Sequence, residues 1–258
     1  MPALRRPLLP LHPLHPLHRL MHRTYALLHA LVLALVIAIA APRAGTAAEV
    51  TDFADVNKII SAISNENTRA MAVTPVFNQR IIHGLPDNWK AGTETSARDT
   101  YSMEFLPEKQ SAQNWREMIM LKAFRGAGKN PQATPKALLA QVAAELRGSC
   151  GDKAITLSLG DTKVDGKDAH GAVMGCTGPP EAALAPGNKG LGEMAFYLAI
   201  RSNDDLFVLQ RSVRTEAFQK ADAPINAANA YLYFRELQPV KLCERDLPEL
   251  ACIQRQQR

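Results

Sequence analysis

Two apolar stretches joined by a four-residue polar turn decide the fold of this chain: EMAFYLAIR at 193–201, SNDD at 202–205 and LFVLQRSV at 206–213. Side chains alternate between the two faces of a strand, and a turn centred within SNDD pairs the stretches as an antiparallel hairpin. The pairs predicted to face each other are Ile200 with Phe207 and Leu198 with Leu209. One face then carries Phe196, Leu198, Ile200, Phe207 and Leu209, and the other carries Tyr197, Ala199, Leu206 and Val208. Because both faces are apolar, the hairpin is predicted to be covered on both sides.

The clearest helix signal in the chain is Thr134-Pro135. Thr is a favoured N-cap residue, and Pro fits the first helical position. An apolar stripe follows at helical spacing, and Gly148 is expected to end the helix. The residues of this stripe are Leu138, Val142 and Leu146.

The remaining elements are predicted from alternation, caps and turn residues. A second hairpin is predicted from strands at 155–159 and 170–176, with Asp165-Gly166 in its turn. Residues 84–99 are interpreted as a turn-rich connection. The other predicted elements are a helix over 51–63, an extended segment over 70–82, strands at 101–105 and 118–124, and a helix from Asp222-Ala-Pro224 to 237.

This order of elements predicts the α+β class, with an antiparallel sheet, helices packed on its faces and a single domain. Between Leu85 and Leu237 the order resembles the Mog1/PsbP-like fold, and the lead Pro86-x-x-Trp89 into a strand is similar to that of such domains. The resemblance implies a non-catalytic accessory, assembly or binding protein. It implies no functional residues, because it rests on element order and not on a motif.

The first residues have the three parts of a secretory signal peptide. Arg19 and Arg23 precede an unbroken apolar run from Ala30 to Ala41, which is shorter than the roughly 20 residues that span a bilayer. Small residues follow, and cleavage is expected after Ala48. Translation from Met21 is an alternative start, because the segment from there to the cleavage site is a complete signal peptide by itself. An uncleaved leader is the one membrane contact that the sequence suggests.

The sequence therefore divides into four parts. These are a signal peptide at 1–48, an N-terminal helix and extended segment at 49–84, an α+β core domain at 85–240, and a disulfide-closed C-terminal tail at 241–258. The four cysteines all follow the leader, and an even number in an exported chain predicts two disulfides with three possible pairings. The short-range pairing is expected, which joins Cys150 to Cys176 and Cys243 to Cys252.

The net charge of +5 belongs to the leader. Residues 1–48 hold five of the 30 Lys and Arg and no acidic residue, which leaves 25 basic against 25 acidic residues in the rest. A neutral body argues against binding to nucleic acid. Compartment and composition together predict a bacterial protein that is periplasmic or secreted.

Candidate chemistry is sparse, because five of the seven histidines lie in the leader and leave His83 and His170. Asp168 shares a strand face with His170, and this pair is the alternative hypothesis: an envelope hydrolase with an oriented general base and water or an undetected Ser as nucleophile. No G-x-S-x-G, Ser-x-x-Lys or H-E-x-x-H motif supplies a partner. The two histidines lack metal-ligand spacing, and no cofactor is predicted.

Three other sets of residues have both a functional and a structural interpretation. Gly126-Ala-Gly128-Lys129 lacks the first Gly and the Ser/Thr of a phosphate loop, so a Gly-rich turn is expected. Trp89 and Trp115 form either a binding platform or core contacts. Arg201, Arg211 and Arg214 either line an anion site or pair with Asp204, Asp205 and Glu216. The leading hypothesis is an exported, non-catalytic protein that binds an unknown protein or small-molecule partner in the cell envelope.

Overall fold

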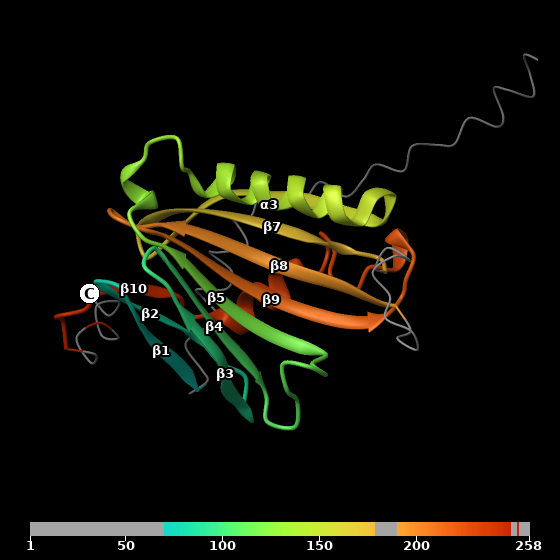
Figure 1. Ribbon diagram of the computed structural model, residues 1–258, viewed down its shortest axis with the longest axis horizontal. Coiled ribbons are helices and arrows are strands. Elements are labelled where there is room, and N and C mark those ends of the chain that lie inside the picture. Colours follow the sequence, from blue (N-terminus) through green and yellow to red (C-terminus); the bar gives the residue numbers. More distant parts are fainter. Residues whose placement is uncertain (1–69, 179–189, 249–251, 253–258) are drawn as a thin grey trace, which may run out of the picture. The chain divides into compact units, whose positions relative to one another are not determined.

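The computed structural model describes residues 70–178, 190–248 and 252 (Figure 1). The chain divides into two units, Met1–Glu49 and Val50–Arg258, and every described residue belongs to the second unit. The predicted leader and the predicted helix over 51–63 lie outside the described residues.

A seven-stranded antiparallel sheet with the strand order β3-β4-β5-β9-β8-β7-β6 forms the centre of the described chain. Its members are β3 (Trp89–Ser96), β4 (Thr100–Pro107), β5 (Glu117–Phe124), β6 (Ala154–Val164), β7 (Lys167–Cys176), β8 (Leu191–Arg201) and β9 (Leu206–Glu216). The predicted register of the β8–β9 hairpin is confirmed: Ile200 faces Phe207, and Leu198 faces Leu209.

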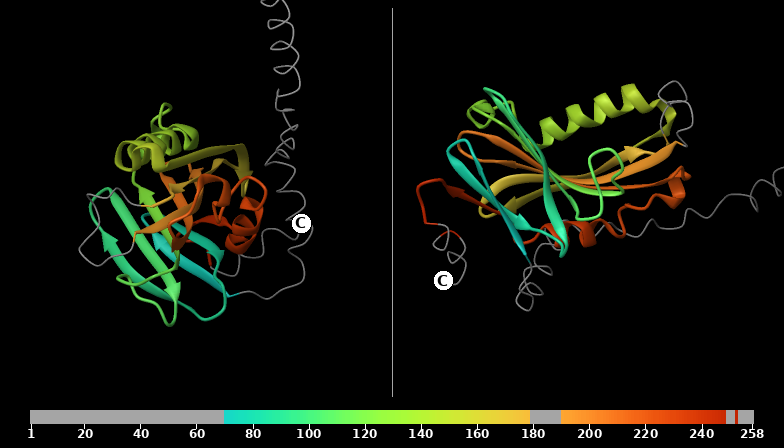
Figure 2. Two further views of the ribbon diagram at one scale, coloured as in Figure 1. Left: turned by 90° about the vertical axis from the view of Figure 1, so that its right-hand side faces the viewer. Right: turned by 60° about the horizontal axis from the view of Figure 1, so that its bottom comes forward.

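The two faces of this hairpin are covered by different layers, as predicted (Figures 1 and 2). On one face the helix α3 (Pro135–Cys150) packs Leu139 and Ala143 against Ala199 and Val208. On the other lies a three-stranded sheet, made of β1 (Met71–Val76), β2 (Gln79–Gly84) and β10 (Lys241–Glu244), together with the helix α4 (Ala230–Leu237). The predicted α+β class, an antiparallel sheet with helices packed on it, is confirmed.

The strand β3 and the start of the last helix differ from the prediction. Residues 84–99 contain the strand β3, which was missed because all its residues except Trp89 are exposed and show no apolar alternation. The last helix begins at Ala230 and not after Pro224, since the Asn226 side chain accepts from the Ala228 amide and the Asn229 side chain from the Asn226 amide. These local bonds hold the chain in turns before the helix starts.

The helix α3 is fixed at its two ends by different interactions. At its start the Thr134 hydroxyl accepts from the Ala137 amide at 3.0 Å, which confirms the predicted cap. At its end the helix passes Gly148 and reaches Cys150, which forms a disulfide with Cys176 at the end of β7. The second disulfide joins Cys243 to Cys252, so both predicted pairings are present.

The Gly-rich turn before α3 docks onto the β8–β9 turn. The Gly128 amide donates to the Asp204 carbonyl at 2.9 Å, and the Arg201 guanidinium donates to the Gly128 carbonyl at 2.6 and 2.9 Å. The Gly126 amide donates to the Asp205 carboxylate at 2.7 Å. Gly128 therefore serves close backbone packing, whereas Gly126 has a φ of 73°, a conformation that favours glycine. Together they position the start of α3.

Replacement of Gly128 by Ala is expected to destabilise the protein by about 1–3 kcal/mol, because overpacking has that typical cost. The added Cβ would lie 2.6 Å from the Asp205 backbone nitrogen, in a position where only backbone movement relieves the clash. Gly148→Ala is the matched control: a Cβ there meets nothing within 4 Å, and the helical site predicts a gain of about 0.5–1 kcal/mol. Denaturant unfolding of both variants measures the difference, and equal midpoints would contradict the docking.

One ionisable side chain lies entirely inside the core. His83 of β2 has no exposed surface, its Nδ1 donates to the Gly84 carbonyl at 2.8 Å, and its ring meets Phe105 edge to face. Burial lowers the pKa of His83 from 6.5 to about 4, against a smaller opposing effect of the bond to Gly84. The imidazole is therefore neutral in the folded protein near pH 7.

The unfolding free energy is expected to fall as the pH drops from about 6.5 to 4, by roughly 3 kcal/mol from His83 alone. In this window the unfolded chain binds a proton that the folded chain excludes, so acid favours unfolding. Urea titrations at several pH values measure the slope. His83→Asn keeps a donor for the Gly84 carbonyl and removes the titration, and a variant with the wild-type slope would refute this assignment.

Candidate functional site

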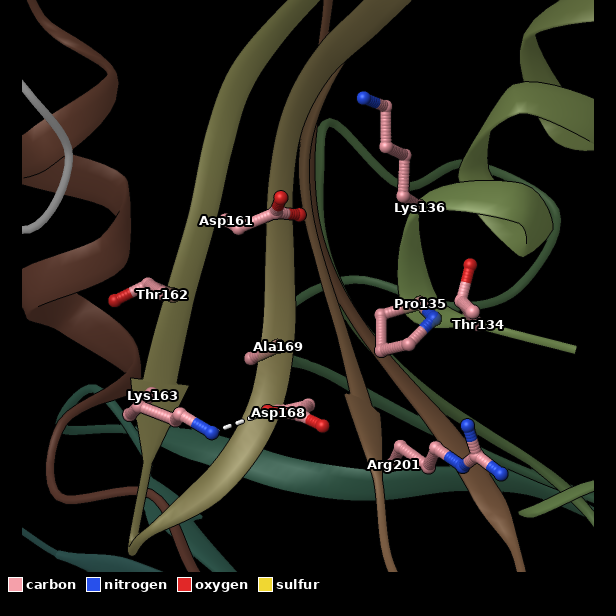
Figure 3. Close-up of a pocket in the computed structure, with 9 residues that line it drawn as sticks. All are labelled: Thr134, Pro135, Lys136, Asp161, Thr162, Lys163, Asp168, Ala169 and Arg201. Carbon is pink, nitrogen blue, oxygen red and sulfur yellow. Dashed lines mark hydrogen bonds and ion pairs between the residues drawn. The ribbon is translucent and has the colours of Figure 1, made fainter. Parts of the chain in front are cut away.

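A groove of about 720 Å³ lies where the start of α3 meets the ends of three strands (Figure 3). It is lined by Thr134, Pro135 and Lys136 of the helix start, Asp161, Thr162 and Lys163 of β6, Asp168 and Ala169 of β7, and Arg201 of β8. The fold brings these segments together because α3 crosses the face of β6, β7 and β8. The volume is in the range of small-molecule sites.

The charged side chains of the groove differ in how they are compensated. Lys163 and Asp168 face each other across the β6–β7 hairpin and form an ion pair. The hydrogen bond from Lys163, with its positive charge, lowers the pKa of Asp168, and Arg201 adds a smaller effect in the same direction. Arg201 itself is bound to backbone carbonyls, and Lys136 is exposed at the helix start.

Three cations and two carboxylates line the groove, so its formal charge is positive. The first turn of α3 contains no acidic residue, and the amide end of a helix dipole adds to the positive potential. Pro135 and the aliphatic parts of the basic side chains supply apolar wall. This arrangement suits a small molecule or peptide that carries an anionic group.

His170 lies beside this groove with a carboxylate that the sequence had not indicated. Its Nδ1 is 2.6 Å from Asp161 Oδ1, and its Nε2 is 2.9 Å from Ser158 Oγ. The ring is 4% exposed, whereas the Asp161 side chain is 75% exposed and Ser158 is exposed. Asp168, which was predicted to orient His170, binds Lys163 instead.

A β-bulge brings Ser158 and Asp161 to the same side of β6. Ser158 faces Ala172, Gly160 faces Gly171 and Asp161 faces His170, which leaves Leu159 as the extra residue. Gly160 has a φ of 105°, a conformation that favours glycine. Without the bulge, residues 158 and 161 would point to opposite faces. A glycine inside an alternating strand was the one available signal for this geometry.

The two tryptophans pack against arginines. Trp115 is 6% exposed, and the Arg214 guanidinium lies 3.6 Å from its ring centroid. The Trp89 ring holds the Arg211 guanidinium at 4.8 Å and packs against the core. Of the two interpretations of Trp89 and Trp115, a binding platform or core contacts, these contacts favour the second.

The expected partners of the arginines were wrong. Arg211 is buried and forms ion pairs with Glu117 and Glu236, and Arg214 pairs with Glu193. Arg201 bonds to the Gly128 and Asn130 carbonyls. Of these three arginines, Arg201 alone lines the groove.

Residues 70–178, 190–248 and 252 contain no group of three or more His, Cys, Asp or Glu side chains arranged to hold a metal ion. Among the same residues no helix is long and apolar enough to span a membrane.

No protein-family model and no curated protein matches this chain, whereas solved structures do. The Ran-binding protein Mog1p of Saccharomyces cerevisiae matches with a TM-score of 0.39 and 13% identity, over 65% of this chain and 91% of that one. Cyanobacterial PsbP (CyanoP) of Synechocystis matches with a TM-score of 0.34 and 8% identity, over 58% of this chain and 83% of that one. LpqN, involved in cell envelope biogenesis of Mycobacterium tuberculosis, matches with a TM-score of 0.35 and 17% identity, over 67% of this chain and 92% of that one.

A structure from Bacteroides thetaiotaomicron also matches, with a TM-score of 0.34 and 13% identity. The match covers 64% of this chain, which spans only 45% of the length of that one. At these identities the matches show a likeness of fold alone, and no residue or activity carries over from them. The matched structures include Mog1 and PsbP proteins, whose fold the element order resembles.

Proposed function

We propose that this is an exported, non-catalytic accessory protein that binds a small ligand or a segment of a partner protein, and that the groove at the start of α3 is its binding site. The groove is the observation that carries the proposal, since it combines a volume of about 720 Å³ with cations from three separate segments. The turn at Gly128 fixes one of its walls, so the site is largely formed before a ligand arrives.

The compartment is supported by the two disulfides and by the leader-like N-terminal sequence. Cys150–Cys176 and Cys243–Cys252 use all four cysteines of the chain, as is common in oxidising compartments. A periplasmic or secreted bacterial protein with a cleaved leader accounts for both features. The partner would then be a component of the cell envelope.

The second candidate is an envelope hydrolase that uses His170 and Asp168. It is less well supported, because the Asp168 carboxylate is bound by Lys163 and His170 has Asp161 as its carboxylate partner. Binding without turnover fits the positive groove more simply.

Native mass spectrometry of protein recovered from the cell envelope tests this proposal. The polypeptide is expected to begin at Glu49 and to weigh about 4 Da less than its reduced form, because two disulfides remove four hydrogens. Free thiols or a retained leader would contradict the proposed export. The same spectra are expected to show additional non-covalent mass that is lost on gentle activation.

Charge reversal separates binding in the groove from binding elsewhere. Lys136→Glu is expected to lower the bound fraction about tenfold, because it reverses a cation at the groove rim without removing a core contact. Lys122→Glu makes the same change at an exposed position on β5 and is expected to retain the bound mass. Loss in both variants, or in neither, would place the ligand outside the groove.

A further inference from the structure

Ser158, His170 and Asp161 form a hydrogen-bonded chain in which a hydroxyl, an imidazole and a carboxylate follow one another. The two distances are 2.9 Å from Ser158 Oγ to His170 Nε2 and 2.6 Å from His170 Nδ1 to Asp161 Oδ1. We propose that Ser158 is an activated nucleophile and a covalent acyl-acceptor site, which takes an acyl group from an ester or thioester. This site goes beyond the proposed binding function and does not depend on it.

The proton positions follow from the groups present. An ionised carboxylate can only accept hydrogen bonds, so Asp161 selects the tautomer of neutral His170 with its proton on Nδ1. The His170 Nε2 is then a bare acceptor, and the Ser158 hydroxyl must donate to it. A serine hydroxyl that donates to an oriented imidazole is the arrangement that makes serine nucleophilic.

The surroundings of Ser158 leave it open to a reagent. β6 is an edge strand of the seven-stranded sheet, and Ser158 is exposed on it. Asp161 belongs both to this hydrogen-bonded chain and to the lining of the groove, so the acceptor site adjoins the cavity. In Figure 3 the Asp161 carboxylate projects from β6 toward the side on which α3 begins. An acyl donor held through an anionic group in the groove would reach Ser158 past this carboxylate.

The transfer balances without any further reactant. The Ser158 oxygen attacks the carbonyl carbon of the donor while its proton moves to His170 Nε2, and a new C–O bond forms. The tetrahedral intermediate collapses with cleavage of the bond to the alcohol or thiol, which leaves with the proton from Nε2. The products are acyl-Ser158 and the free alcohol or thiol, and Asp161 stays ionised throughout.

The same contacts in a purely structural role would anchor β6 to β7 and give Ser158 no special reactivity. Reactivity therefore separates the two interpretations. Ser149 is the natural internal control, because it is also exposed but its hydroxyl donates to the Glu145 and Leu146 carbonyls and contacts no base.

The experiment treats the disulfide-bonded protein with a fluorophosphonate probe and, separately, with 4-nitrophenyl acetate. Intact mass and peptide mapping then locate the adduct. One adduct per chain at Ser158 is expected, with none at Ser149. The labelling rate is expected to fall roughly 100-fold or more in His170→Gln, in line with the usual contribution of a general base.

Because His170 is buried, its replacement can unfold the protein, and Asp161→Ala provides the second test. Asp161 is exposed, so this variant is expected to remain folded and still lose at least tenfold in labelling rate. Asp152→Asn removes another exposed carboxylate, in the turn before β6, and is expected to label at the wild-type rate.

The outcomes are distinct for the two proposals. No adduct at Ser158, equal labelling of Ser149, or an unchanged rate in folded Asp161→Ala would each overturn the acyl-acceptor site. Release of a single equivalent of 4-nitrophenol per chain supports it. Continued release supports it as well, but would refute the non-catalytic function proposed above and favour the hydrolase.

Discussion

The fold depends on one constraint, which is that the β8–β9 hairpin is apolar on both of its faces. Phe196 and Leu209 on one face and Ala199 and Val208 on the other cannot remain exposed, so the sheet needs a layer on each side. The helix α3 covers one face, and the small sheet with α4 covers the other (Figure 2). The groove exists because α3, on its way across the sheet, begins above the ends of β6, β7 and β8.

Most of the fold could be predicted from residues that act locally. The register of the central hairpin followed from a four-residue turn and from alternation, and α3 followed from Thr134-Pro135. The strand β3 could not be predicted, because an edge strand with exposed side chains carries no apolar pattern. Likewise the predicted helix start at Asp222-Ala-Pro224 was too early, because side-chain bonds of Asn226 and Asn229 hold the chain in turns until α4 begins at Ala230.

The candidate site was less predictable, because it depends on contacts between segments. Alternation alone predicts that Ser158 and Asp161 point to opposite faces of β6. The bulge at Leu159 and Gly160 places them on the same face. Sequence reasoning paired His170 with Asp168, whereas the structure places Asp161 against His170 and Lys163 against Asp168. The groove combines residue 136 with residues 163 and 201, and no local pattern relates them. The predicted ion-pair partners of Arg211 were wrong for the same reason, since its actual partners, Glu117 and Glu236, are distant from it in sequence.

The bulge in β6 also affects how the protein behaves at high concentration. β6 ends the seven-stranded sheet, and a regular edge strand offers unpaired amides and carbonyls on which another chain can add a strand. An inserted residue disrupts the even spacing of those groups and increases the local twist. Addition of a strand would also have to desolvate the exposed charged side chains of Asp161 and Lys163. The irregularity that aligns Ser158 with Asp161 thus also makes the edge a poor template for self-association.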